Sequence, residues 1–184
     1  MPELPSIAVT ERSLQIDDDL FGFDEVTSVG YVKYVTRASG AVTNVERRFE
    51  LWTPDRRRSV NLDGARVERE ERNDLWAQLV AVSQQAIEPR LRNEALNRIQ
   101  RYGETVEVGK LALTRAGFAW KATLRQRQFT WPEHRRTIYE NSRIKVIAHS
   151  GGKDKTVAAL GTEVPNAVLL PKLMSACGEA FTPG

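Results

Sequence analysis

The sequence predicts an α+β protein built mainly from antiparallel strands, and three observations lead to this fold class. Short segments of alternating apolar and polar residues recur along the chain, turn residues separate them closely, and two stretches change to the helical period. Spacing this short favours hairpins over parallel crossovers. With 184 residues, 41% hydrophobic and 28% charged, the chain has the size and composition of one or two globular domains.

The first half is predicted to hold five strands followed by an amphipathic helix. The strands are expected at residues 6–10, 13–16, 26–35, 45–52 and 58–62. The turns between them are expected at Asp17-Asp18-Asp19, Ser39-Gly40, Thr53-Pro54-Asp55 and Asp63-Gly64. Behind Asn73, a good N-cap, apolar residues recur at helical spacing as far as Ile87, and Pro89 is expected to stop this helix.

The second half is predicted to repeat this plan after a short helical connector. The connector covers residues 91–103 and ends at Gly103, because a left-handed C-cap suits glycine. The strand period then returns at residues 106–108, 111–113, 118–120, 129–131, around 138, 144–148 and 156–160. A last apolar helix is expected to run from a cap at Asn166 to an end at Gly178.

Two short segments recur in the same order in both halves. Ala8-Val9-Thr10 corresponds to Ala112-Leu113-Thr114, and Phe23-Asp24-Glu25 corresponds to Trp131-Pro132-Glu133, each an aromatic residue, one further residue and a glutamate. Each half also ends in a helix that an asparagine precedes. The longer spacing in the first copy predicts an insertion near residues 36–47.

The repeated plan is a short curved antiparallel sheet closed at one end by a single C-terminal helix. The segments that indicate this plan are the two aromatic-x-Glu segments and residues 103–114 and 164–170. This plan resembles the pleckstrin-homology-like (PH-like) superfamily, which includes the GRAM domains, and two copies resemble its tandem members of unknown function. The resemblance implies PH-like domains at residues 1–90 and 104–184, each a curved sheet or partly open barrel with one C-terminal helix. It also implies a binding scaffold in preference to an enzyme.

No catalytic or metal-binding motif is complete in the sequence. Residues 151–156 lack the Ser or Thr after lysine that a phosphate loop needs and are interpreted as a hairpin turn, and residues 17–28 lack two oxygen ligands of a calcium loop. Cys177, the single cysteine, reads as a core residue, and with His134 and His149 it gives no zinc ligand set. We therefore expect a non-enzymatic protein with no metal, cofactor or small-molecule substrate.

Positive charge is concentrated in the second half of the chain. Residues 93–184 hold 14 basic and 8 acidic residues, whereas residues 1–92 hold 13 basic and 16 acidic ones. Arg125 and Arg127 alternate along one predicted strand and so are expected to share a face. We expect a cationic patch on the second domain, formed by Lys121, Arg125, Arg127, Arg135, Arg136 and Arg143.

Two other groups of residues are weighed beside this patch. The four tryptophans are expected in the core, although Trp120, near Arg125 and Arg127, is alternatively a residue that stacks on a base or lies at a membrane interface. The run Arg56-Arg57-Arg58 is predicted to be a solvated turn with acidic neighbours such as Glu50.

The cationic patch leads to three hypotheses about the partner. An anionic membrane surface is one, because each basic residue near such a surface contributes about 1 kcal/mol. A protein partner or self-association is another, since the two halves differ in charge. Nucleic-acid binding through the same Arg-rich strands is the alternative that the pI of about 9.2 suggests, although no recognised motif accompanies it. Without a long apolar run or a signal peptide, the protein is expected in the cytoplasm, including the periphery of a membrane.

Overall fold

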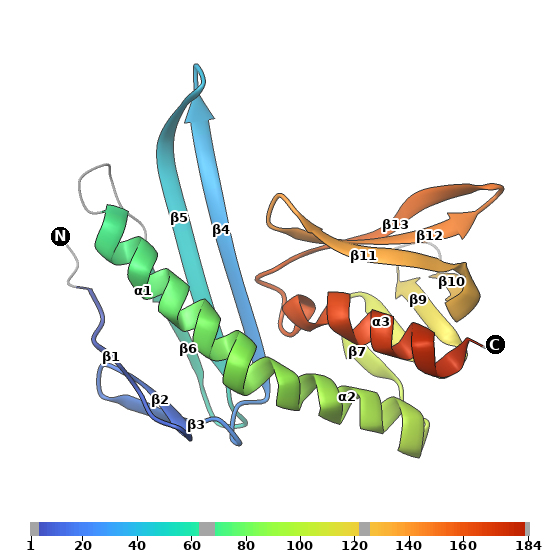
Figure 1. Ribbon diagram of the computed structural model, residues 1–184, viewed down its shortest axis with the longest axis horizontal. Coiled ribbons are helices and arrows are strands. Elements are labelled where there is room, and N and C mark those ends of the chain that lie inside the picture. Colours follow the sequence, from blue (N-terminus) through green and yellow to red (C-terminus); the bar gives the residue numbers. More distant parts are fainter. Residues whose placement is uncertain (1–3, 63–68, 122–125, 183–184) are drawn as a thin grey trace. The chain divides into compact units, whose positions relative to one another are not determined.

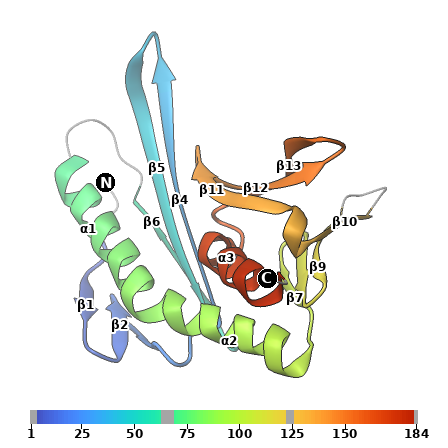
Figure 2. The same ribbon diagram turned by 45° about the vertical axis from the view of Figure 1, so that its right-hand side comes forward.

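The computed structural model describes residues 4–62, 69–121 and 126–182 (Figures 1 and 2). It has several open antiparallel sheets, a long helical segment in the middle of the chain and a C-terminal helix. The chain divides into two compact units, Met1–Pro89 and Arg90–Gly184. The predicted α+β class and the antiparallel pairing of its strands are confirmed.

The first unit contains two three-stranded antiparallel sheets. Their strands are β1 (Ile7–Val9), β2 (Ser13–Ile16) and β3 (Asp19–Gly22), and β4 (Ser28–Ala38), β5 (Ala41–Trp52) and β6 (Arg57–Asn61). Asp17, Ser39 and Gly40 adopt positive φ at the hairpin turns, which confirms two of the predicted turns. The sequence did not predict β3, because its first residue, Asp19, belongs to a turn signal. The turn expected at Asp63-Gly64 lies outside the described residues.

A helical segment then runs through Pro89 without a break, and the predicted stop there is wrong. It consists of α1 (Arg69–Val82), a π-helical turn (Ser83–Ile87) and α2 (Glu88–Tyr102). A proline inside a helix removes one N–H donor and its ring clashes with the carbonyl one turn earlier. The π-helical turn widens the helix immediately before Pro89, and the Glu88 N–H donates to the Ser83 carbonyl, five residues back. The helical segment therefore continues through Pro89.

Asn73 lies inside α1 and is not its N-cap, contrary to the prediction. Its Oδ1 accepts a hydrogen bond from Nη2 of Arg47, a residue of β5 that is only 2% exposed. Nη1 of Arg47 also donates to the Leu62 carbonyl at 3.3 Å. A buried cation requires acceptors of this kind. Asn73 therefore fastens α1 to β5.

The second unit contains most of α2, a four-stranded sheet, a three-stranded sheet and a last helix, α3 (Leu170–Phe181). The strands are β7 (Val106–Val108), β8 (Leu111–Thr114), β9 (Gly117–Lys121), β10 (Gln126–Thr130), β11 (His134–Glu140), β12 (Arg143–Ser150) and β13 (Lys153–Gly161). Their orders are β10-β9-β8-β7 and β11-β12-β13. Trp131 belongs to a 3-10 helix (Trp131–Glu133) and not to the predicted strand, because Thr130 and Glu133 form a capping box there.

Helix α3 begins and ends later than the sequence predicts. Asn166 makes no side-chain cap hydrogen bond and instead takes up a left-handed conformation, with φ 63°, before a 3-10 turn (Ala167–Leu169). Pro171 falls in the first turn of α3, where its missing N–H costs no intrahelical bond. Gly178 does not end the helix, since its carbonyl still accepts from the Thr182 N–H at 3.0 Å.

The core of the second unit lies between its two sheets and its helices. Trp131 and Cys177 are buried in it, as predicted, and Trp120 packs partly buried against it. Ile99 contributes from α2, and α3 packs on β11. The sheets stay open and no barrel forms among the described residues, so the expected partly open barrel is not present.

The two units share an order of elements: three strands, an aromatic-x-Glu segment, three strands and a helix. Residues 23–25 follow β3 as residues 131–133 follow β10, and the second unit adds most of α2 and strand β7 at its start. Strands β4 and β5 have 11 and 12 residues, whereas β11 and β12 have 7 and 8. Figure 1 shows the extra length of the β4–β5 hairpin, which includes the predicted insertion.

Candidate functional site

Five of the six residues predicted to form the cationic patch lie in the described part of the second unit, and all five are exposed. Arg135 and Arg136 are in β11, and Arg143 begins β12. Lys121 ends β9 and Arg127 is in β10. Arg125 lies outside the described residues.

Three basic side chains share the outer face of the β11–β12–β13 sheet. The register between β11 and β12 places Arg136, Arg143 and Lys145 on the same side of the sheet. Ile144 and Val146 alternate with them along β12 and are buried in the core, at 2% and 0% exposure. Arg136, Arg143 and Lys145 therefore project away from the core, and we call this surface the cationic face.

Two carboxylates neutralise part of the charge around the cationic face. Glu140 Oε2 lies 2.6 Å from Lys145 Nζ. Asp154 Oδ1 lies 3.0 Å from His149 Nδ1 and 3.5 Å from Arg135 Nε. The hydrogen bond with His149 and the charge of Arg135 lower the pKa of the Asp154 carboxyl, so that it stays ionised.

Arg136 and Arg143 have no ion-pair partner among the residues that the structure describes. The sheet that carries them, formed by residues 134–161, holds six Lys or Arg residues against only Glu140 and Asp154. The cationic face thus keeps an excess of positive charge after its internal pairs are formed. A broad open sheet face of this kind attracts anions without enclosing them.

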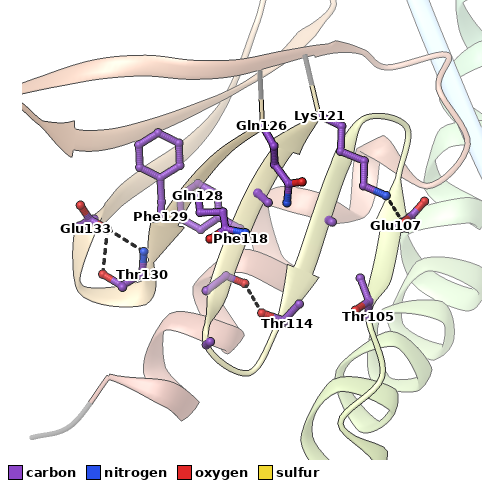
Figure 3. A pocket seen from close by; sticks show the side chains of 14 residues that line it. Thr105, Glu107, Thr114, Phe118, Lys121, Gln126, Gln128, Phe129, Thr130 and Glu133 are labelled. Carbon is purple, nitrogen blue, oxygen red and sulfur yellow. Dashed lines mark hydrogen bonds and ion pairs between the residues drawn. The ribbon is translucent and has the colours of Figure 1, made fainter. Parts of the chain in front are cut away.

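Lys121 and Arg127 do not belong to the cationic face. The register pairs Lys121 with Gln126 and Arg127 with Trp120, so the two basic side chains start from opposite faces of the β9–β10 hairpin. Lys121 forms an ion pair with Glu107 on the outer face of the four-stranded sheet (Figure 3). The predicted patch is therefore divided between two sheets.

Cys177 and His134, two potentially reactive side chains of the second unit, are packed against the core. Burial raises the pKa of the Cys177 thiol to about 12, so it stays protonated and is a poor nucleophile. His134 packs edge-on against Phe118 and Trp131, its Nε2 lies 2.9 Å from Thr137 Oγ1, and burial lowers its pKa. No group of three or more His, Cys, Asp or Glu side chains in the described ranges is arranged to hold a metal ion.

In the first unit, the run of three arginines has the predicted acidic neighbours, but Arg57 and Arg58 belong to β6 and not to the predicted turn, because they pair with β5 across the hairpin. Arg57 pairs with Glu50, and Arg58 Nη2 lies 2.5 Å from Asp17 Oδ2. Arg56 Nη1 lies 3.2 Å from Asp19 Oδ1. These ion pairs also account for the two aspartates that resemble part of a calcium loop.

Sequence reasoning missed the roles of two basic residues. Arg115 caps the end of α2, since its Nε donates to the Ile99 carbonyl at 3.0 Å and its Nη2 donates to the Gln100 carbonyl. No local sequence pattern predicts this contact, because Arg115 lies far from the end of α2 in the sequence. Lys145 belongs to the cationic face, and its alternation with Arg143 along one strand was a sufficient signal for including it.

Comparison of the chain with protein-family models, with curated proteins and with solved structures found no match. Within the described ranges, no helix combines the length and the apolar content needed to cross a lipid bilayer. The geometry of the chain itself is therefore the basis for assigning its function.

Proposed function

We propose that the chain is a non-enzymatic binding module made of two PH-like units. The order of elements supports this proposal, because after α2 the second unit has four strands, then three strands, then one helix. The first unit has three strands, three strands and a helix in the same order. The recurrence of the aromatic-x-Glu segment at the same place in both units supports a duplicated domain. Sheets closed by one helix in this way serve mainly as binding scaffolds in the superfamily that the sequence resembles.

The partner that we propose is an anionic membrane surface on the cytoplasmic side, bound through the cationic face. The observation that carries this assignment is the pair of exposed guanidinium groups, Arg136 and Arg143, on an outward sheet face where neither has an ion-pair partner among the described residues. Two such groups contribute about 2 kcal/mol at an anionic surface. This is enough for weak, salt-sensitive association and suits a flat array of headgroups.

Vesicle flotation tests the proposal. The probes are phosphatidylcholine vesicles with and without phosphatidylserine, at low and at physiological salt. We expect the protein to float only with the anionic vesicles, and less at the higher salt. The double variant Arg136→Glu/Arg143→Glu should abolish flotation.

The matched control is Lys110→Glu/Lys172→Glu, which changes the net charge equally at two exposed lysines away from the cationic face. This control should retain flotation. Equal loss in both variants would mean that total charge, and not the cationic face, drives binding. If the native protein does not float at all, the membrane assignment is wrong, and a salt-dependent gel shift with nucleic acid or a search for an acidic protein partner becomes the next step.

A further inference from the structure

The outer face of the β7–β10 sheet carries a groove of about 500 Å³ (Figure 3). The register aligns Glu107, Ala112, Ala119 and Gln128 in one row across the four strands. The two central strands thus contribute methyl groups, and the two outer strands contribute long polar side chains. The groove consequently runs along the central strands, with β7 and β10 as its walls.

Charged groups border the groove on both sides. Lys121 of β9 forms its ion pair with Glu107 of β7, and this bridge passes over β8, which lies between the two strands. Glu133, after the end of β10, accepts hydrogen bonds from the Thr130 N–H at 2.7 Å and from its hydroxyl at 2.9 Å. These bonds lower the pKa of the Glu133 carboxyl and keep it ionised.

The net charge of the groove is opposite in sign to the net charge of the second unit. The second unit holds 16 Lys and Arg residues against 8 Asp and Glu residues. Among the described residues, by contrast, the groove is lined by two carboxylates and one ammonium group, and Lys121 already pairs with one of these carboxylates. Glu133 is therefore left to attract a cationic group of a ligand.

The β10 wall has the spacing of an extended polypeptide. Gln126, Gln128 and Thr130 project into the groove from alternate positions, about 6.7 Å apart. The amides of Gln126 and Gln128 have no hydrogen-bond partner among the described side chains and backbone groups outside the sheet. A polypeptide in extended conformation presents a backbone N–H and C=O to one side with the same two-residue repeat. Side-chain amides can satisfy both groups.

Other ligand classes fit the groove less well. Nucleic acids and anionic headgroups carry the wrong sign for Glu133. A sugar ring usually stacks on an exposed aromatic side chain, but Phe118 and Phe129, the aromatic residues among the described lining, are only 3% and 8% exposed.

We propose that this groove binds an extended polypeptide segment that carries a basic side chain. The main chain of the segment bonds to the amides of Gln126 and Gln128, small side chains lie over Ala112 and Ala119, and the basic group meets Glu133. This site is separate from the cationic face, so its test does not depend on membrane binding.

Fluorescence anisotropy tests the proposal with two labelled nonapeptides of serine and alanine, one containing two arginines and the other two glutamates in their place. We expect saturable binding of the basic peptide only. Ala119→Trp fills the floor of the groove from an outward-facing position and should abolish binding. Glu133→Gln keeps the acceptor of the capping box and removes the charge, so it should weaken binding about fivefold.

The control Glu179→Gln removes the same charge from the exposed surface of α3 and should leave binding unchanged. The Ala119 methyl signal in NMR spectra should shift on titration of the native protein with the basic peptide. Binding that survives Ala119→Trp, equal binding of both peptides, or the lack of saturable binding would each overturn the proposal. Circular dichroism of the variants separates loss of binding from loss of folding.

Discussion

Replacement of Gly117 by alanine is expected to destabilise the second unit through one close approach between neighbouring strands. Gly117 begins β9 with φ 152°, and a Cβ at this position would lie 1.9 Å from the Phe129 carbonyl oxygen and 2.9 Å from Thr130 Cα, both in β10. Real Cβ contacts are not shorter than about 3 Å, so β10 must move by about 1 Å.

The cost has two parts. An alanine in this region of φ adds about 1–3 kcal/mol of backbone strain, and displacement of β10 weakens at least one ladder hydrogen bond at about 1 kcal/mol. We therefore expect the free energy of unfolding of the second unit to fall by about 2–4 kcal/mol. Urea denaturation followed through the amide NMR signals of β8 and β12 reports on this unit alone.

Gly152→Ala is the matched control for Gly117→Ala. Gly152 also has positive φ, 78°, but a Cβ there would have no heavy atom within 4 Å. This variant should cost only the backbone strain, about 1 kcal/mol. If Gly117→Ala costs no more than Gly152→Ala, the close approach of β9 and β10 does not constrain the sheet and the reasoning is refuted.

Three further predictions concern the stability of the second unit and the state of its thiol. Because burial lowers the pKa of His134, the folded unit binds a proton less readily than the unfolded chain, so its free energy of unfolding should be full above the ordinary pKa of 6.5 and fall as the pH decreases through it. Urea titrations between pH 5 and 8, in steps of about one unit, should show this fall in the native protein and a flatter profile in His134→Gln; identical profiles would contradict it. Arg115→Ala removes the cap of α2 and should cost about 1–2 kcal/mol in urea denaturation, whereas Arg101→Ala, at an exposed position in the last turn, should cost less than about 0.5 kcal/mol. Cys177 should not react with a chromogenic disulfide reagent at pH 8 until denaturant is added, and rapid labelling of the native protein would show that the thiol is accessible.

Local signals in the sequence located most of the strands. Apolar alternation marked the buried faces of β2, β5, β8 and β12, and residues that tolerate left-handed backbone marked the turns between strands. Gly103, with φ 68°, ends α2 as predicted. These features depend on neighbours in the chain, which is why the sequence alone was enough.

The sequence-based predictions failed where a distant partner decides the role of a residue. Asn73 has the residue type of an N-cap, but buried Arg47 recruits its oxygen from another element. Pro89 is a helix breaker by type, yet the preceding π-helical turn accommodates it. The sequence-based prediction also placed Lys121 and Arg127 in one patch, because only the register of β9 and β10 shows that their side chains start from opposite faces of the sheet. The groove depends on four strands in register and has no signal in the linear sequence.

The measurement that tests the central claim most directly is the paramagnetic broadening of amide NMR signals by anionic vesicles that carry a spin label on their headgroups. The proposed function predicts selective broadening around Arg136, Arg143 and Lys145, reversed by salt and not seen with neutral vesicles. Broadening centred on other elements, or none at the cationic face, would contradict the proposal that this face binds the membrane.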